Sequence, residues 1–447
     1  MKKCTLLIFA LACMIVQAQP RYVGGDISML PQYEKYSSGY KDVNNRKVND
    51  LLSWLKSDCG WNTFRVRLFV HPAQKAPDYQ TKDYAIVQDL AYVTALGKRI
   101  KDAGAYFMLD FHYSDSWVDA GHIQPPAAWK GKSDAVMADS VARYTRDVLT
   151  ALNAAGATPD LVQVGNEIMY GLCGMRVHPY DYDGDNWDGY LGLLKAGCNA
   201  VREVCPQAQI IIHTDRPCNM SYDYYYYNKL IQGGVDYDII GLSYYPFWHA
   251  DVVPAQSYTG AQTLNPLVTA INYLAQVFPS KRVHIVETAT NFQYWPSEGV
   301  NYDTRAVWPA TVAGQYQFVR DLVDAMLPLS NMDGISYWFP EDAGNGDNVD
   351  WTTKTGMVEE NWSNRGFWKE DQTNAGHAIN KTGNVTADKT AADVCAPYYM
   401  GKFVGFEPQG IEPCAEDETQ RAKKYLYNHI LIIERNGVRY TPDGKKI

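Results

Sequence analysis

The chain has 447 residues, of which 46% are hydrophobic and 20% charged, a composition typical of a globular protein with a large core. The net charge is −9 and the body of the chain has no Lys/Arg-rich run, which argues against nucleic-acid binding and favours a neutral ligand over a phosphorylated one. The content of 33 Tyr and 12 Trp is high, and it fits either a sugar-binding cleft or an aromatic-rich core.

The first 18 residues have the pattern of a secretory signal peptide. A charged start is followed by an apolar stretch at 6–16 and an A-x-A-like cleavage site at 16–18. The stretch is too short to span a bilayer stably, and no later segment looks transmembrane. We expect export to the medium, the periplasm or the cell surface. A lipid anchor at Cys13 is less favoured, because Ala10 is a poor first residue for a lipoprotein box.

Eight short segments predict buried β-strands, and several of them are near-continuous apolar runs. They start 30 to 55 residues apart, which leaves room for a helix and loops between successive strands. Six helices are predicted in those gaps, at 49–55, 84–102, 133–155, 189–204, 263–277 and 313–326. This series predicts an α/β fold, a (β/α)8 TIM barrel, with a doubly wound sheet as the alternative. The predicted strands are 22–28, 63–69, 106–112, 161–167, 209–214, 239–245, 283–288 and 334–340.

The C-terminal residues lie outside this barrel pattern. We predict a signal peptide at 1–18, a single catalytic domain at 19–403, a Gly/Pro/acidic linker at 404–420 and a tail at 421–447. The tail contains strand-like runs on both sides of Asn436-Gly437, which is the signature of a β-hairpin. A sorting signal and a cap on the barrel are the two roles that we consider for it.

Polar and aromatic residues gather at the C-terminal ends of the predicted strands, the face on which barrel enzymes assemble their active sites. Glu167 ends the fourth strand and Glu287 lies near the end of the seventh, so the barrel places them across its mouth. Glycoside hydrolysis needs such a pair of carboxylates, one on each side of the scissile bond. The alternative for either Glu alone is a structural ion pair. No G-x-S-x-G elbow and no H-E-x-x-H motif is present.

Neighbouring side chains fit the same chemistry, although each has a structural alternative. Arg65 can hold the seventh-strand carboxylate ionised, or it can serve a structural ion pair. Tyr245 can donate a hydrogen bond to that carboxylate, or it can simply pack in the core. Trp338 can form the floor of a sugar subsite or cap the barrel. His112 and His213 can bind sugar hydroxyls or be satisfied within the core.

These residues stand in motifs that resemble glycoside hydrolase family 53, the endo-β-1,4-galactanases of clan A, over residues 21–400. The resemblance implies that Glu167 is the acid/base, that Glu287 is the nucleophile of a retaining mechanism, and that Asn166 contacts the sugar 2-hydroxyl. It also implies β-1,4-galactan of pectic type I arabinogalactan as the substrate, and we expect a monomer. The motifs are Gly24–Ser28, Trp61–Arg67, the run 111–129, Gly165-Asn166-Glu167, Ser243–Trp248, Val286-Glu287-Thr288 and Tyr337-Trp338. We expect the substrate-binding residues to be Asp26, Arg65, His112, Asp115, Trp117, Asn166, His213, Asp215, Tyr245, Trp248 and Trp338.

The sequence departs from the family pattern in two places. Residues 297–303 lack the Asp/Gly/His/Asn-rich pattern of the calcium loop found in some bacterial members, so we assign no metal ligands and expect no cofactor, and calcium binding stays open. Residues 288–291 replace the usual Thr-Ala-Trp-Pro, which leaves the product length open. Of the nine Cys, two lie in the signal peptide, and no pair has metal-ligand spacing. We predict a disulfide between Cys173 and Cys218, because they follow adjacent strands.

Two other functions remain open at this point. Another clan A glycanase, such as a mannanase or glucanase, would share both Glu residues and differ at the loop residues Trp117, Trp129 and Trp248. A catalytically inactive surface protein that binds glycans could keep the same cleft. The presence of both Glu residues and Arg65 argues against the inactive protein, because binding alone needs no nucleophile.

Overall fold

A computed structural model of the chain describes residues 20–36, 40–42, 46–72, 86–249, 263–292, 304–305, 307–344, 365–370, 385–386, 392–407, 423–427, 430–435 and 438–440. Its centre is a closed barrel of eight parallel strands in the order β1-β12-β11-β10-β9-β6-β5-β4. Because β1 pairs with both β12 and β4, the sheet closes, so the (β/α)8 prediction is confirmed and the doubly wound alternative is wrong. The barrel strands are β1 (Tyr22–Asp26), β4 (Thr63–Leu68), β5 (Tyr106–Phe111), β6 (Leu161–Val164), β9 (Gln209–Thr214), β10 (Ile239–Tyr244), β11 (Arg282–Thr288) and β12 (Met332–Trp338).

The barrel strands are buried almost throughout, which explains why their sequences read as apolar runs. Neighbouring strands approach very closely at Gly24 of β1. A Cβ atom built there would lie 1.6 Å from the backbone oxygen of Thr63 on β4, so a residue with a side chain would separate the two strands. The glycine therefore allows β1 and β4 to close the barrel.

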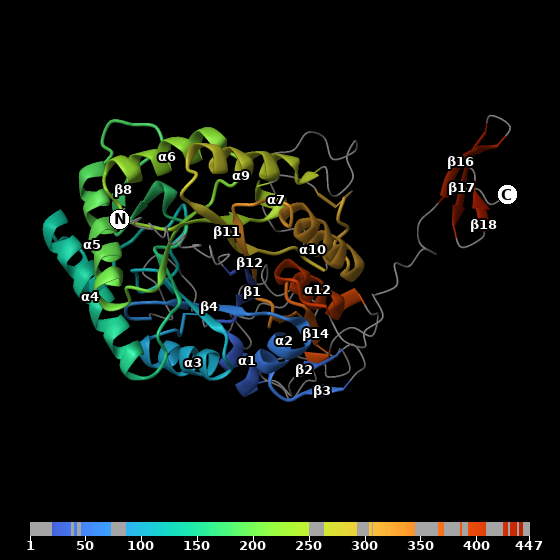
Figure 1. Cartoon of the computed structure of the whole chain (residues 1–447), viewed down its shortest axis with the longest axis horizontal. Coiled ribbons are helices and arrows are strands. Elements are labelled where there is room, and N and C mark those ends of the chain that lie inside the picture. The colour runs from blue at the N-terminus through green and yellow to red at the C-terminus, as the bar shows by residue number, and fades with distance from the viewer. Residues whose placement is uncertain are drawn as a thin grey trace, which may run out of the picture.

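Helices surround the barrel (Figure 1). The six predicted helices are confirmed, with shifts of up to six residues at their ends. Several begin at a side-chain cap, such as Asp89 accepting from the Tyr92 amide at 2.8 Å. Among the larger helices described, α6 was not predicted, and neither were the shorter α1, α7 and α12. The buried residues of α6, Asp223, Tyr226, Tyr227 and Leu230, nevertheless follow helical spacing. The larger helices are α2 (Leu51–Cys59), α3 (Leu90–Asp102), α4 (Asp134–Ala154), α5 (Trp187–Val204), α6 (Met220–Gln232), α9 (Asn265–Val277) and α10 (Val312–Met326).

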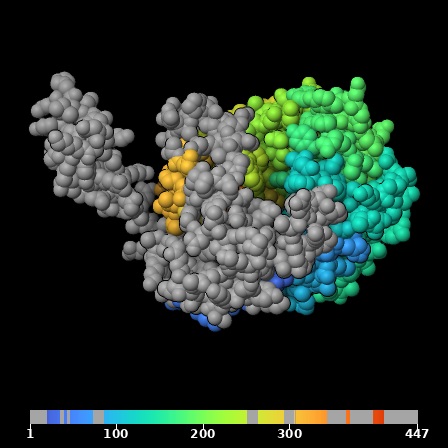
Figure 2. Space-filling view, turned by 180° about the vertical axis from the view of Figure 1, so that it is seen from behind, coloured from blue at the N-terminus to red at the C-terminus, as the bar shows by residue number. Residues whose placement is uncertain are grey.

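Short elements complete the body of the molecule. The C-terminal helix α12 packs on α2 and α10, and Trp61 Nε1 donates to the Pro397 oxygen at 2.9 Å. Figure 2 shows that the segments between about residues 90 and 240, drawn cyan to green, form one continuous side of the protein. The short elements are α1 (Leu30–Tyr36), β2 (Tyr40–Lys41), β3 (Lys47–Val48), η1 (Ala127–Trp129), η2 (Ile168–Tyr170), β7 (Gly171–Leu172), β8 (Met175–Arg176), α7 (Pro246–His249), β13 (Ala343–Gly344), β14 (Trp368–Glu370), β15 (Val385–Thr386), α12 (Ala392–Gly401) and η4 (Lys402–Val404).

The C-terminal tail forms a sheet of its own. The predicted hairpin is present as β17 (Ile430–Arg435) and β18 (Val438–Tyr440), and a further strand, β16 (Lys423–Tyr427), pairs with β17 to give three antiparallel strands. The signal peptide at 1–18 and most of the linker, 408–420, lie outside the described residues, so the proposed domain boundaries stay predictions. None of the helices in the described ranges combines the length and hydropathy needed to cross a bilayer.

The predicted disulfide between Cys173 and Cys218 is wrong. Cys173 is a buried free thiol, and its Sγ donates to the backbone oxygen of Tyr113 at 3.6 Å. The reason is the direction of the side chain. Cys173 has a φ of 52° in the tight turn between β7 and β8, and this turn directs the sulfur into the core rather than across to the next loop. Cys414 and the side chain of Cys395 lie outside the described residues.

Candidate active site

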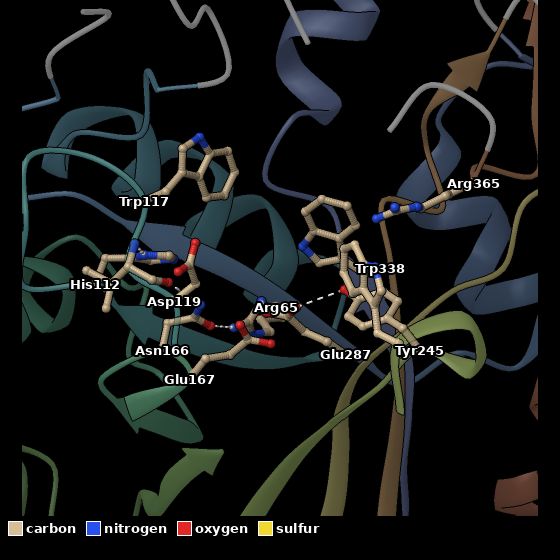
Figure 3. A pocket seen from close by; sticks show the side chains of 12 residues that line it. Arg65, His112, Trp117, Asp119, Asn166, Glu167, Tyr245, Glu287, Trp338 and Arg365 are labelled. Carbon is tan, nitrogen blue, oxygen red and sulfur yellow. Dashed lines mark hydrogen bonds and ion pairs between the residues drawn. The ribbon is translucent and has the colours of Figure 1, made fainter. Parts of the chain in front are cut away.

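A pocket opens at the C-terminal ends of the barrel strands and holds about 610 Å³ of empty space, including the part open to solvent. Both predicted catalytic residues line it, together with seven of the predicted substrate-binding residues. Figure 3 shows Glu167, Asn166, Asp119 and His112 on one side and Glu287, Tyr245 and Trp338 on the other, with Arg65 between them. The lining residues are Arg65, His112, Trp117, Val118, Asp119, Asn166, Glu167, Tyr245, Trp248, Glu287, Trp338 and Arg365.

Glu167 follows β6 at a sharp turn of the backbone. Its φ of 48° and ψ of 49° lie in the left-handed region, where a residue with a side chain is strained, and such strain is concentrated at functional sites. One carboxylate oxygen, Oε1, accepts from Ser243 Oγ at 2.5 Å. Burial raises the pKa of Glu167 well above its ordinary value, and the nearby carboxylates Glu287 and Asp215 add to the rise. These effects favour the protonated form of Glu167.

Glu287 lies on β11 and is held by two donors. Arg65 Nη1 is 2.9 Å from Oε1, and Tyr245 Oη donates to Oε2 at 2.9 Å. Burial raises the pKa of Glu287 to about 7, and Arg65 is the main group that opposes the rise. Among the residues that the structure describes, no comparable cation contacts Glu167, so the first proton to leave the pair comes from Glu287. The two carboxyl groups are thus biased towards one acid and one anion.

Arg65 is the centre of a buried charge cluster. It is 1% exposed, and its guanidinium contacts Asp26 Oδ2 at 2.7 Å and Asp110 Oδ2 at 2.8 Å in addition to Glu287. It also donates to Asn166 Oδ1 at 2.8 Å. These charge-assisted bonds fix the guanidinium beneath the pocket, so that it holds Glu287 and Asn166 in one arrangement. Arg65 therefore does more than form a structural ion pair.

His213 lies behind the pocket and sets the direction of the hydrogen bond to Glu167. Its Nδ1 faces two fixed donors, the Gln163 side-chain amide at 3.1 Å and the Glu167 backbone amide at 3.3 Å. The nearby Asn166 Oδ1 already accepts from Arg65. Burial lowers the pKa of His213 well below its ordinary value, so the ring is neutral and its proton is assigned to Nε2. Nε2 is 2.8 Å from Ser243 Oγ, which turns the hydroxyl proton towards Glu167 Oε1.

His112 lines the pocket, but both of its ring nitrogens are engaged. Nδ1 accepts from the Val118 amide at 3.0 Å, and Nε2 is 3.1 Å from Asp110 Oδ2. The ring also packs against Phe69 and Trp117, with centroid distances of 4.9 Å and 5.9 Å. His112 thus contributes a rigid wall to the pocket.

Four predicted substrate-binding residues lie outside the pocket lining. Asp26 is buried behind Arg65, and His213 lies behind Ser243. Asp115 accepts from the backbone amides of residues 71 and 127, at 3.0 Å and 2.8 Å, and so ties two loops together. Asp215 is buried beside Arg216, 3.3 Å away, and burial raises its pKa to about 6.

Sequence reasoning missed three lining residues: Val118, Asp119 and Arg365. The first two fall inside the run 111–129, where the motif was the available signal. Arg365 follows the long connection after β12, and no sequence motif marked it as a pocket residue. Its guanidinium is 5.1–5.6 Å from the ring centroids of Tyr245, Phe247, Trp248 and Trp338, so it packs against the aromatic wall by cation–π contacts.

Across the described ranges, no group of three or more His, Cys, Asp or Glu side chains is arranged to hold a metal ion. Residues 297–303, where the family's calcium loop was expected to be absent, lie outside the described residues.

Comparison with known proteins agrees with this architecture. The model of glycosyl hydrolase family 53 matches residues 22–380. A probable arabinogalactan endo-β-1,4-galactanase A of Aspergillus terreus is 30% identical over 79% of this chain and 92% of its own, and an arabinogalactan endo-β-1,4-galactanase of Cellvibrio japonicus is 31% identical over 72% and 80%. The GH53 catalytic domain of Ignisphaera aggregans superimposes with a TM-score of 0.66 at 25% identity, covering 90% of this chain and 99% of that domain. The chain is therefore a glycoside hydrolase and belongs to glycosyl hydrolase family 53.

Proposed function

We propose that the protein is an endo-acting, retaining β-1,4-galactanase that cleaves pectic galactan and type I arabinogalactan. The observation that carries the mechanism is the unequal environment of the two carboxyl groups. Glu287 is held by Arg65 and Tyr245, which favour its anion, whereas Glu167 is buried near other carboxylates, which favours its protonated form. A retaining glycosidase needs one anion and one acid, side by side.

In the first step, the Glu287 carboxylate attacks the anomeric carbon and forms a covalent glycosyl–enzyme bond. The glycosidic C–O bond breaks, and Glu167 gives its proton to the leaving oxygen. In the second step, Glu167, now a carboxylate, takes a proton from water. The resulting hydroxide attacks the anomeric carbon and releases Glu287. Configuration is retained because the carbon is inverted twice.

The substrate assignment is supported by the relatives that carry the galactanase name and by the pocket wall. Trp117, Trp248 and Trp338 give aromatic surfaces for sugar rings. We propose that the enzyme is exported, because residues 1–18 have the pattern of a signal peptide, and that it acts as a monomer. No cofactor is proposed, because the two carboxyl groups described above supply the acid and the nucleophile. A mannanase, a glucanase and an inactive glycan-binding protein are the alternatives.

One experiment separates these functions. The purified enzyme is incubated with galactan, mannan and cellulose, reducing ends are counted, and the first anomer released is identified by NMR. We expect reducing ends from galactan alone, with β-configured products appearing first. Glu287→Gln is the matched control for contaminating activity. Hydrolysis of mannan or cellulose instead would identify another glycanase, α-configured first products would refute retention, and no hydrolysis would favour the binding protein.

A further inference from the structure

Exposed aromatic side chains gather at one place on the described surface. Within the described ranges, six large hydrophobic side chains are exposed, and four of them lie on two adjoining segments, the loop 177–186 and the start of α6. A single exposed ring needs no explanation, but a contiguous group indicates a binding surface. The four are Tyr180, Tyr182, Met220 and Tyr225.

Three tyrosines of this region, Tyr180, Tyr222 and Tyr225, hold one another in fixed orientations, and Tyr182 packs on His178 instead. Tyr180 packs edge-to-face on Tyr222 with a centroid distance of 5.3 Å and an interplanar angle of 82°, and it lies 4.8 Å from Tyr225. We call Tyr180, Tyr182, Tyr222 and Tyr225 the tyrosine platform. Because their packing restrains the rings before a ligand arrives, binding would lose little conformational entropy.

The platform lies on the same face of the barrel as the pocket. The loop 177–186 belongs to the connection that leaves β6 after Glu167, and α6 begins the connection that leaves β9. Both segments therefore follow the C-terminal ends of neighbouring barrel strands. Figure 1 shows α6 beside the region of β8 at the upper edge of the molecule.

A series of ring contacts joins the platform to the neighbourhood of Glu167. Tyr170, three residues after Glu167, lies under the Arg216 guanidinium at 5.5 Å and contacts His178 with a centroid distance of 6.0 Å. His178 in turn contacts Tyr182 at 4.7 Å, and its Nδ1 is fixed by Asp185 at 2.7 Å. Tyr170 and His178 thus link Tyr182, one member of the platform, to the segment that begins at Glu167.

We propose that the tyrosine platform binds the leaving-group half of a β-1,4-galactan chain, beyond the catalytic pocket. This inference rests on the proposed function, because the acid Glu167 must face the leaving oxygen, so the departing chain extends past Glu167. The pyranose rings of galactan offer apolar faces to the tyrosines. Beside Tyr182, Asp181 and Asp183 are exposed, and Lys229 pairs with Asp181 at 2.5 Å, so these three groups together carry one net negative charge and do not favour an acidic polysaccharide.

The test compares two substrates with single variants of the platform. Tyr182→Ala and Tyr225→Ala each remove one exposed ring, and Ile231→Ala, which removes an exposed side chain from the other end of α6, is the matched control. We expect each tyrosine variant to lower kcat/KM on long galactan roughly fivefold, the loss for one aromatic contact. We expect no change on a nitrophenyl galactoside, whose leaving group is too short to reach the platform.

A binding assay keeps this inference separate from the proposed function. Galactan binding is measured by affinity electrophoresis in the Glu287→Gln background, with polygalacturonate as the acidic comparison. Weaker retardation of the tyrosine variants by galactan, with the Ile231→Ala control unaffected, supports the platform even if the wild type fails to hydrolyse galactan. Unchanged binding and unchanged kcat/KM on galactan would overturn the inference. Equal losses on both substrates would overturn it too, because they indicate a structural role.

Discussion

Replacing Ser243 with alanine tests how the barrel interior controls Glu167. Ser243 is fully buried, and its hydroxyl accepts from His213 Nε2 and donates to Glu167 Oε1. Since Oε1 accepts this bond, the transferable proton is assigned to Oε2. As that proton leaves in the first step, negative charge develops on Glu167, and the Ser243 bond becomes charge-assisted. Ser243 is therefore a positioning residue for both steps of the mechanism.

The size of the effect follows from that single bond. A hydrogen bond to a charged group contributes roughly 1.5–3 kcal/mol, which corresponds to a rate loss of roughly ten- to a hundredfold. Donation from Ser243 also lowers the pKa of Glu167, against the rise caused by burial. The alanine variant loses this opposing effect, so the pKa of Glu167 rises further. Because the first step needs protonated Glu167, the basic limb of the pH–rate profile moves to higher pH.

The assay measures kcat/KM on galactan and on an aryl galactoside with a good leaving group, each across pH. We expect kcat/KM on galactan to fall and its basic limb to shift to higher pH. The rate of the first step on the aryl substrate should stay unchanged, because its leaving group needs little protonation. Ser336→Ala is the matched control, because Ser336 is also buried and bonded to a histidine, His284, at 3.0 Å, but lies outside the pocket lining. Wild-type turnover and an unshifted basic limb in Ser243→Ala would refute this reasoning.

Three further predictions concern charge, stability and the tail. Arg65→Lys keeps the positive charge but loses the forked contacts of the guanidinium, so the pKa of Glu287, about 7, should rise. The acidic limb of the kcat/KM profile should then move to higher pH. An unmoved acidic limb would contradict the role of Arg65. Asp223 is buried, and neither of its oxygens is hydrogen-bonded to a described residue. Burial raises its pKa, so its proton stabilises the fold at low pH, and that contribution is lost as pH rises above about 4. Asp223→Asn should therefore raise the melting temperature at pH 7 more than at pH 4, and an equal change at both would contradict the assignment. Removal of residues 408–447 should leave galactan turnover unchanged, because the body ends at the buried Phe403 and the turn after it. A large loss of turnover in the folded, truncated protein would show that the tail supports the barrel.

The barrel could be predicted because each strand is buried on both faces and therefore reads as a short apolar run between turn signals. The helix α6 was missed because its run of four tyrosines hides the contrast between polar and apolar faces on which helix prediction depends. Its buried face becomes visible only once the neighbouring strands are in place. The disulfide prediction failed for a related reason. Adjacent loops bring two backbones together, but the turn at Cys173 decides where its sulfur points.

The two carboxyl groups of the site could be predicted because strand order alone places Glu167 and Glu287 across the barrel mouth. The groups that distinguish them were harder to find. Ser243 is a common residue inside a strand, and its role depends on the tautomer of His213, which neighbouring donors decide. Arg365 joins the pocket through a long connection whose sequence has no regular period. Such residues are selected by three-dimensional contact and leave no local pattern.

The central claim, that Glu287 is the nucleophile and Glu167 the acid/base, is tested most directly by azide rescue of the two alanine variants. On an aryl galactoside, Glu167→Ala should still form the glycosyl–enzyme intermediate but release it slowly, because the base is missing. Azide needs no base, so it should restore turnover and give a β-galactosyl azide. In Glu287→Ala, azide should attack from the vacated face and give the α-azide. The opposite pair of products would reverse the two roles, and full activity in both variants without azide would contradict the account.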